Sequence, residues 1–252
     1  MKCFLCKSNT VTQKYTYGGG VFAQESQEYF KNVKLLTCDE CKISFCENIL
    51  RENLDKYYAK TQKTLKLNNN RFKEFNSRFF TQVLYYINHT KLNKDISVLE
   101  IGPSTQGILP TLKIFQNNIK YFYFDQIDLK HDHKETFKLG EYFSPDHKNL
   151  PKLDLIWMSH SLEHIFPDEL IKTLSSFYEA LNKNGKIFIE IPNDVKMKTF
   201  NAPHTLFFEK KSLKKLFKKL NFKIIAYSEI NDLDEYMDEE NYSQQELFEQ
   251  KQ

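Results

Sequence analysis

The sequence predicts an α/β protein whose largely parallel sheet is covered by helices on both faces. This prediction depends on near-continuous apolar runs, on the amphipathic segments between them, and on a glycine turn directly after the first run. Strands that are apolar on both faces are typical of parallel sheets enclosed by helices. Ligands of such sheets bind beyond the carboxyl ends of the strands. Side chains at those ends are therefore the first candidates for a functional site.

Strand and helix candidates alternate through the second half of the chain. We expect strands at 96–102, 119–125, 153–159, 185–192 and 222–228, and helices at 108–116, 167–183 and 209–220. Residues 50–90 also predict helix, because apolar residues recur there at intervals of three and four. The members of this stripe are Phe72, Phe75, Phe79, Val83 and Ile87. We interpret the stripe as core or interface packing between two modules; lining a substrate pocket is the alternative.

Composition narrows the class of protein. A chain of 252 residues that is 40% hydrophobic and 15% aromatic predicts a globular protein rather than a disordered one. The net charge of +3 balances 36 basic against 33 acidic residues and does not favour a nucleic-acid partner. The sequence contains neither an apolar run of about 18 residues nor the apolar core of a secretion signal. We therefore expect a cytoplasmic protein that does not bind membranes.

Four of the five cysteines form two closely spaced pairs, Cys3-x-x-Cys6 and Cys38-x-x-Cys41. Each pair can offer two thiolates to one tetrahedral Zn²⁺, and four ligands leave no open coordination position. The spacing therefore predicts a structural zinc ion in a small β-rich ribbon. Two disulfides, which a reducing compartment disfavours, and buried thiols without a metal are the alternatives. Cys46 lies outside the pairing and is expected to be a core residue.

The stretch "ISVLEIGPSTQG" (96–107) reads as a buried strand that enters a glycine turn. Gly102 permits close approach of the backbone to a ligand, and Glu100 places a carboxylate beside the turn. Asp125 ends the next predicted strand, where an acidic side chain can accept hydrogen bonds from both hydroxyls of a ribose. A glycine that only shapes the junction and a solvated turn acid are the alternatives.

Five segments in order, "VLEIGPSTQG", "YFYFD", "LDLIWMSHSLEHI", "LNKNGKIFIEIPN" and "HTLFFEKKSLKKLFKKLNF", resemble class I S-adenosylmethionine-dependent methyltransferases over residues 95–228. With the cysteine pairs in front, the chain looks like the subgroup that carries an N-terminal zinc-binding module, many of whose members methylate sugars or other small metabolites. The resemblance implies a Rossmann-like sheet and S-adenosylmethionine as cofactor. Ser104 and Gln106 stand where the family's first motif has glycines.

The resemblance also implies which residues bind the cofactor. Gly102 matches the motif near the methionine part, and Glu100 organises that loop or the cofactor's ammonium group. Asp125 matches the ribose-binding acid, and Glu141 is the candidate on the adenine side. The full set of cofactor candidates is Glu100, Gly102, Ser104, Asp125, Glu141, Met158 and Ser159.

Two histidine-bearing segments are the candidates for chemistry. In "SHSLEHI", one helical turn would direct His160, Glu163 and His164 toward one face. They could bind a divalent ion, as acidic groups and a histidine do in some methyltransferases that this chain resembles, or anchor the loop by hydrogen bonds while His160 faces substrate. The anchoring role is the one we expect.

In "NAPHTLFFE", His204 matches a histidine that lies near the substrate in related small-molecule methyltransferases. A neutral imidazole can accept a hydroxyl proton at pH 7. His204 is thus the first candidate for the catalytic base and His160 the second. A purely structural loop role for His204 is the alternative.

These inferences combine into a domain plan and an activity. We expect a zinc-binding module at 1–50, a helical linker at 51–94, a methyltransferase domain at 95–230 and a flexible acidic tail at 231–252. The expected reaction is O-methylation of a small polar acceptor, such as a nucleotide-linked sugar or a phosphorylated precursor of surface polysaccharide. An RNA-modifying methyltransferase and a non-catalytic relative are the alternatives. The sequence does not predict the oligomeric state.

Overall fold

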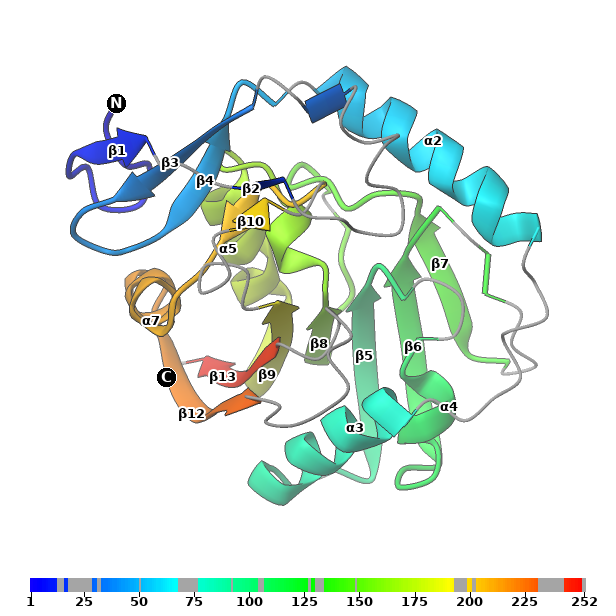
Figure 1. Cartoon of the computed structure of the whole chain (residues 1–252). Helices are drawn as coiled ribbons and strands as arrows, with labels where there is room; N and C mark the ends of the chain where they lie inside the picture. The colour runs from blue at the N-terminus through cyan, green and yellow to red at the C-terminus, as the bar shows by residue number, and fades with distance from the viewer. Residues whose placement is uncertain are drawn as a thin grey trace.

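The computed structural model contains a central sheet of seven strands. They are β5 (Asp95–Ile101), β6 (Asn118–Phe124), β7 (Thr136–Gly140), β8 (Leu153–Ser159), β9 (Leu181–Pro192), β12 (Phe222–Ile230) and β13 (Ser243–Gln250). Their order across the sheet is β12–β13–β9–β8–β5–β6–β7 (Figure 1). The structure describes residues 1–12, 16–17, 29–30, 33–49, 51–67, 77–91, 93–103, 107–126, 128–129, 134–147, 149–192, 199–200, 203–230 and 243–250.

The sheet is mostly parallel, which confirms the predicted fold class. β5, β6, β7, β8 and β9 pair in parallel, whereas β13 is antiparallel to both of its neighbours, β9 and β12. Each of the five predicted strands overlaps a strand of this sheet. The parallel pairing brings the carboxyl ends of β5 to β9 to one edge, which is the edge where the candidate residues are found.

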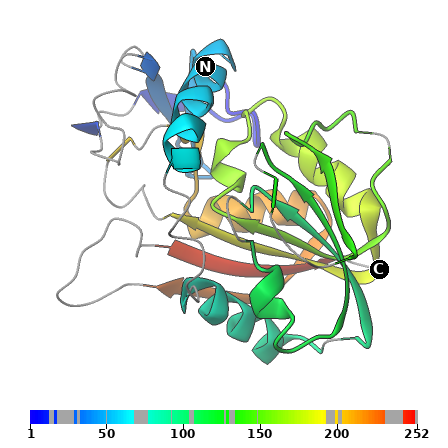
Figure 2. The ribbon, with the colours of Figure 1, turned by 90° about the vertical axis from the view of Figure 1, so that its right-hand side faces the viewer.

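Helices cover both faces of the sheet. On one face lie α3 (Ser77–His89) and α4 (Leu109–Leu112), and on the other lie α5 (Leu170–Ala180) and α7 (Lys210–Lys219) (Figure 2). Successive side chains of a strand point to opposite faces, so each central strand contributes to two cores. In β8, Ile156 and Met158 join the core under α5 and α7, while Leu155 and Trp157 join the core under α3 and α4. This division explains the near-continuous apolar runs.

The predicted helix at 108–116 is shorter in the structure. α4 ends at Leu112, and the chain continues in tight turns in which the amides of Ile114 and Phe115 donate to the carbonyls three residues earlier. Three-residue bonds of this kind often close the last turn of a helix.

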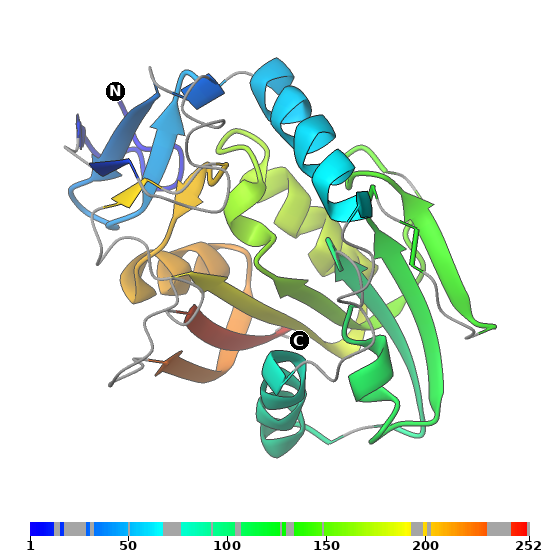
Figure 3. The ribbon, with the colours of Figure 1, turned by 45° about the vertical axis from the view of Figure 1, so that its right-hand side comes forward.

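A second, smaller sheet holds the cysteine pairs. It is antiparallel and contains β1 (Thr10–Thr12), β3 (Lys34–Cys38), β4 (Ser44–Glu47) and β11 (Leu206–Phe207), in the order β1–β3–β4–β11. β11 comes from the segment after β9, so the N-terminal sheet is completed by the other half of the chain. Figure 3 shows this sheet beside β9 and α7, on the side of the molecule away from β6 and β7.

The N-terminal sheet shares a hydrophobic core with the large sheet. Leu36, Ile43 and Phe45 belong to the same buried cluster as Leu213 and Phe217 of α7. In addition, Nζ of Lys219 donates to the carbonyl of Leu5 over 2.9 Å. The two sheets are therefore packed together as one body. A separate two-stranded pairing joins β2 (Thr16–Tyr17) to β10 (Thr199–Phe200).

Among the described residues between the two sheets, two helices follow one another along the chain. α2 (Arg51–Leu67) lies beyond the carboxyl ends of the strands (Figure 1), and α3 follows it. Of the predicted apolar stripe, Phe79, Val83 and Ile87 pack into the core under α3, whereas Phe72 and Phe75 lie outside the described residues. In the part of the chain that the structure describes, none of the helices is long and apolar enough to span a bilayer.

The prediction of a flexible tail at 231–252 was wrong for its last part. Residues 243–250 form β13, which lies between β9 and β12 and pairs with both. The strand was missed because its apolar signal is only two residues long. Leu247 and Phe248 point to opposite faces, and each is fully buried in one of the two cores. Residues 231–242 lie outside the described residues.

Replacing Phe248 tests this strand. Its ring stacks on Phe217 of α7 with centroids 3.5 Å apart, and the side chain is fully buried. We expect Phe248→Ala to lower the free energy of unfolding, measured in urea, by about 3–5 kcal/mol because it leaves a cavity. The control Ile114→Ala removes a side chain that is 59% exposed and should change stability by about 0.5 kcal/mol or less. Equal effects of the two substitutions would contradict the placement of β13.

Candidate functional site

Three predicted cofactor residues lie in a row at the carboxyl edge of the sheet. Gly102 follows β5, Asp125 follows β6, and Glu141 follows β7. The amide of Gly102 donates to the carbonyl of Phe124 over 2.9 Å, and the amide of Asp125 donates to the carbonyl of Gly140 over 3.1 Å. Backbone pairing thus continues one residue past the ends of β5 and β6. Gly102, Asp125 and Glu141 therefore lie next to one another along the edge of the sheet. Asp125 is half-buried and Glu141 is exposed.

The turn after β5 requires glycine. Gly102 has φ of +68°, in the left-handed region, and a Cβ atom there would lie 3.5 Å from Oγ of Ser161. The Ser161 hydroxyl lies within hydrogen-bond distance of the carbonyls of Ile101 and Ser159. Ser161 therefore ties the turn after β5 to the turn after β8. Ser104, another predicted cofactor residue, lies outside the described residues.

The side chain of Glu100 is buried beneath the glycine turn and forms hydrogen bonds there. Its Oε2 accepts hydrogen bonds from the amide of Ile108, at 2.8 Å, and from the hydroxyl of Tyr121. Gly107 packs so closely that a Cβ atom there would lie 2.7 Å from this same Oε2. Burial raises the pKa of Glu100 to about 7, although the hydrogen bonds from Tyr121 and Ile108 oppose the shift. Glu100 is only 2% exposed, and its carboxyl group forms a hydrogen bond with the residue that follows Gly107.

Two predicted cofactor residues, Met158 and Ser159, end β8 and differ in how accessible their side chains are. Met158 is fully buried, and its side chain belongs to the core under α5 and α7. Ser159 is half-buried, and its Oγ accepts hydrogen bonds from Nη2 of Arg78 at 3.1 Å and from Nε2 of Gln82 at 2.8 Å. A role of Met158 toward a cofactor is thus restricted to its backbone.

A charged network that the sequence did not predict joins α3 to the ends of β8 and β9. Arg78 Nε and Gln82 Nε2 each donate to Oε1 of Glu190 over 2.7 Å. Burial alone would raise the pKa of Glu190, but His160 and Arg78 together lower it to about 2. Glu190 is therefore a buried carboxylate anion. The sequence carried a signal for it, namely an acid inside the apolar strand "IFIEIP", and Arg78 and Gln82 are spaced one helical turn apart.

Directly after β8, four side chains from two segments form one polar centre, which we call the histidine centre: His160, Glu163, His164 and His204. Nδ1 of His160 lies 3.6 Å from Oε1 of Glu163, and the rings of His164 and His204 are 4.9 Å apart. Glu163, His164 and His204 each offer a ligand atom, and these atoms all lie within 4.8 Å of one another. The structure thus brings together the two predicted histidine segments.

The prediction of one helical turn through His160, Glu163 and His164 was wrong in part. The turn η2 (Leu162–His164) is a short 3₁₀ helix that excludes His160. His160 has φ of +52°, and its amide donates to the carbonyl of Glu190 over 2.8 Å. Histidine tolerates this left-handed conformation better than most residues do. His160 still approaches Glu163, while its Nε2 lies 3.5 Å from Oε1 of Glu190.

Tyr58 of α2 packs against the histidine centre. The Tyr58 hydroxyl lies 3.1 Å from Nδ1 of His164, and the two rings are in edge contact. Burial, reinforced by the neighbouring imidazoles of His204 and His160, lowers the pKa of His164 well below its ordinary value, so this side chain is neutral at pH 7. Tyr58 was not predicted, because nothing in the sequence relates it to a histidine 106 residues away.

The N-terminal sheet positions His204. β11 pairs with β4 through Leu206 opposite Phe45, and the amide of Cys46 donates to the carbonyl of Thr205 over 2.9 Å. Thr205 is fully buried, its amide donates to the carbonyl of Glu163 over 2.8 Å, and its hydroxyl donates to the carbonyl of Ile165 over 2.5 Å. Thr205 therefore fixes the segment of His204 both to the N-terminal sheet and to η2.

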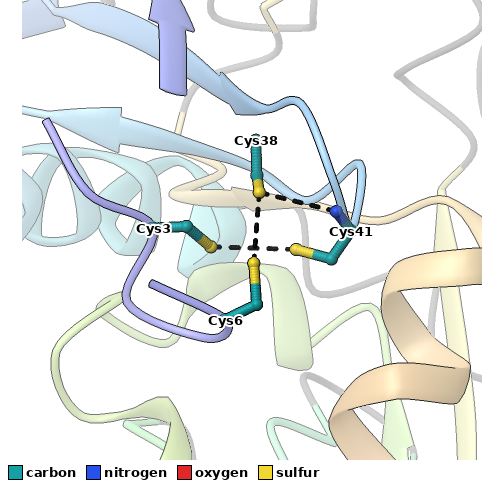
Figure 4. A group of neighbouring side chains, drawn as sticks. All are labelled: Cys3, Cys6, Cys38 and Cys41. Carbon is teal, nitrogen blue, oxygen red and sulfur yellow. Dashed lines mark hydrogen bonds between the residues drawn. The ribbon is translucent and has the colours of Figure 1, made fainter. Parts of the chain in front are cut away.

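The four paired cysteines converge in the N-terminal sheet. Their sulfur atoms point toward one another (Figure 4), with 3.7 Å between the sulfurs of Cys3 and Cys41 and 3.3 Å between those of Cys6 and Cys38. A tetrahedral zinc ion with Zn–S bonds of about 2.3 Å requires about 3.8 Å between sulfurs. The donor set and its spacing therefore fit a zinc ion. Cys46 is buried in a different cluster, as predicted.

The mostly parallel sheet, in which β13 runs antiparallel between β9 and β12, and the helices on both of its faces form a Rossmann-like methyltransferase fold. The family described as "Methyltransferase domain" matches residues 68–227, which is more than half of the chain. The chain belongs to this family and is a methyltransferase. No curated protein matches the sequence.

Solved structures share the fold at low sequence identity. The 1,6-didemethyltoxoflavin N1-methyltransferase of Burkholderia thailandensis, with 1,6-didemethyltoxoflavin and S-adenosylhomocysteine bound, is similar at a TM-score of 0.58 and 9% identity, over 88% of this chain and 96% of that chain. The N-methyltransferase NodS of Bradyrhizobium japonicum, with S-adenosylhomocysteine, gives 0.54 and 9% identity, over 75% and 98%. A complex of the Trm112 methyltransferase activator of Haloferax volcanii with a methyltransferase gives 0.55 and 11% identity, over 73% and 95%.

The buried carboxyl of Glu100 predicts a pH dependence of stability. The pKa of Glu100 is about 7 in the folded protein against an ordinary value of 4.5, so the folded state binds a proton more tightly than the unfolded state. The contribution of the protonated Glu100 to the free energy of unfolding is fully present below pH 4.5 and is lost as the pH rises through about 7. Between these limits we expect wild type to lose up to about 3 kcal/mol relative to Glu100→Gln.

Urea unfolding at pH 5 and pH 8 measures this difference. Glu141→Gln, which removes an exposed carboxyl group from the same edge of the sheet, is the matched control and should follow wild type. If the Glu100→Gln and wild-type profiles run parallel, the assignment of Glu100 as a proton-binding buried group is wrong.

Proposed function

We propose that this methyltransferase transfers the methyl group of S-adenosylmethionine to a hydroxyl of a small polar acceptor. A nucleotide-linked sugar and a phosphorylated precursor of surface polysaccharide are the acceptor classes we favour. The observation that carries the proposal is the histidine centre, which brings His160 and His204 to the edge of the sheet beside the glycine turn. We assign the chain to the subgroup of methyltransferases with an N-terminal zinc module.

The residues in a row at the carboxyl edge of the sheet, Gly102, Asp125 and Glu141, are suited to binding the cofactor. When bound, S-adenosylmethionine supplies a methyl group activated by its sulfonium sulfur. Asp125 would accept hydrogen bonds from the ribose hydroxyls. Glu141, which follows the neighbouring strand β7, would lie on the adenine side. Gly102 and Gly107 have no side chains at the two ends of the glycine turn, which allows the backbone at those positions to approach a ligand. Glu100 would stabilise that turn through its hydrogen bond to the amide of Ile108.

The histidine centre is suited to accept the proton that the acceptor hydroxyl loses. His204 is our first candidate for this base and His160 our second, because the side chains of both remain partly accessible. Ser161 connects this centre to the cofactor turn, since its hydroxyl contacts the carbonyl of Ile101 and its Oγ lies opposite Gly102. Alignment of the acceptor supplies most of the acceleration, and base catalysis adds roughly 10²–10⁴.

The zinc ion that we propose for Cys3, Cys6, Cys38 and Cys41 is structural. All four positions of its tetrahedron would be filled, so it has no site for water or substrate. Its role would be to fix the turns of the N-terminal sheet, and through β4 and β11 it would support the segment that carries His204. We also propose the domain boundaries of the sequence plan, with β13 added to the methyltransferase domain.

One observation favours RNA as the acceptor instead. α7 exposes Lys211, Lys214, Lys215 and Lys218 on one side, and Lys219 of the same helix contacts the first cysteine turn through Leu5. A row of lysines next to a cysteine ribbon can bind phosphates. Salt-sensitive retardation of RNA in a gel, lost in a Lys214→Ala/Lys218→Ala variant, would support this second function.

Asp125 is tested by cofactor binding. We expect Asp125→Ala to weaken the binding of S-adenosylmethionine tenfold or more, because charge-assisted hydrogen bonds contribute about 1.5–3 kcal/mol. Calorimetric titration measures the affinity. The control Asp128→Ala removes a neighbouring acid that is 84% exposed and pairs with Lys138, and should leave the affinity unchanged. An unaltered affinity in Asp125→Ala would refute the ribose assignment.

The activity is tested by a methyl-transfer screen. Sugar nucleotides and phosphorylated metabolites are incubated with the enzyme and labelled S-adenosylmethionine, and products are identified by mass spectrometry. For an acceptor so identified, His204→Ala should keep cofactor affinity and reduce turnover by about 10² or more. His89→Ala, at the exposed end of α3, is the control. Binding of the cofactor without transfer to any member of these classes would overturn the proposed acceptor.

A further inference from the structure

We propose that Glu163, His164 and His204 bind a second zinc ion, distinct from the ion at the four cysteines. The three residues offer two imidazole nitrogens and one carboxylate oxygen, and their ligand atoms lie within 4.8 Å of one another. Bond lengths of about 2.0–2.2 Å would bring such atoms to roughly 3.4 Å apart, so small side-chain adjustments complete the site. Two histidines and one carboxylate are a donor set that zinc accepts readily.

The backbone already holds the three residues in place. Glu163 and His164 are consecutive in η2, and Thr205, the neighbour of His204, bonds to the carbonyls of Glu163 and Ile165. Thr205 therefore fixes His204, the ligand that is distant in sequence, beside Glu163 and His164. Glu163 is 1% exposed, and His164 and His204 are half-buried. A preformed arrangement of this kind reduces the ordering that metal binding requires.

Tyr58 has the position of an outer partner. Histidine ligands commonly use their second ring nitrogen for a hydrogen bond that fixes the orientation of the ring. The Tyr58 hydroxyl lies 3.1 Å from Nδ1 of His164, so in this proposal Nε2 of that ring would be the ligand atom. His160 lies on the other side of the centre, 3.6 Å from Glu163, and stays outside the ligand set.

Three protein ligands leave at least one coordination position open. Such a position is the mark of catalytic rather than structural zinc sites, and it can take an oxygen atom of a substrate. If the proposed function holds, the ion would bind the acceptor hydroxyl and lower its pKa. Coordination would occupy one ring nitrogen of His204, so in the metal-bound centre His160, the second candidate base, would take the place of His204 as acceptor of the proton. Metal binding itself does not depend on the proposed function.

Metal content distinguishes the two sites. The purified full-length chain is loaded with Zn²⁺, freed of loosely bound ions and analysed by mass spectrometry for zinc per chain. We expect two equivalents in wild type and in the control His89→Ala. His204→Ala and Glu163→Gln should each retain one equivalent, and Cys3→Ser should lose the ion of the cysteine cluster. The conservative Glu163→Gln, checked by circular dichroism, protects the test against misfolding of the alanine variant.

Two results would overturn the second site. One is a single zinc equivalent in wild type that disappears in Cys3→Ser. The other is two equivalents in wild type that remain in both His204→Ala and Glu163→Gln. The outcome is separate from that of the acceptor screen, because a chain that binds two ions and methylates none of the acceptors would refute only the proposed reaction.

Discussion

The pairing of β4 with β11, completed by Thr205, is the interaction on which the candidate site depends. It joins a strand of the cysteine-bearing sheet to the segment that follows β9, and so it determines where His204 lies. Without this pairing, the segment that carries His204 would not be held beside Glu163 and His164. The N-terminal sheet therefore has a direct role in building the centre, in addition to packing against α7. A metal that orders the cysteine turns would act on the same segment.

The site also shows how charge is distributed among buried groups. Glu190 is kept ionised by Arg78 and His160, whereas the pKa of Glu100 is shifted upward by burial. Both are acids near the carboxyl ends of strands in the same sheet, and their surroundings separate them. Glu190 has a cationic partner from α3, and Glu100 has a phenol and a backbone amide as neighbours. Groups with displaced pKa values in one region are typical of functional sites.

Much of the fold could be predicted because it depends on local patterns. Buried parallel strands are recognised by apolar runs, and the cysteine pairs by their spacing. β13 could not be predicted, since Leu247 and Phe248 are its only strongly apolar residues and become significant only between two existing strands. The roles of Tyr58 and Arg78 depend on contacts across about a hundred residues, which no short motif contains. The assignments of individual site residues stay predictions.

The position of β13 has a consequence for the order in which the protein can form. β9 and β12 are synthesised before the strand that separates them, and each leaves the ribosome with an open backbone edge on the side that β13 later fills. Exposed edges of this kind pair readily with other chains. Completion of the sheet must wait until residues 243–250 have emerged, so the newly made protein depends on β13 to cover the facing edges of β9 and β12.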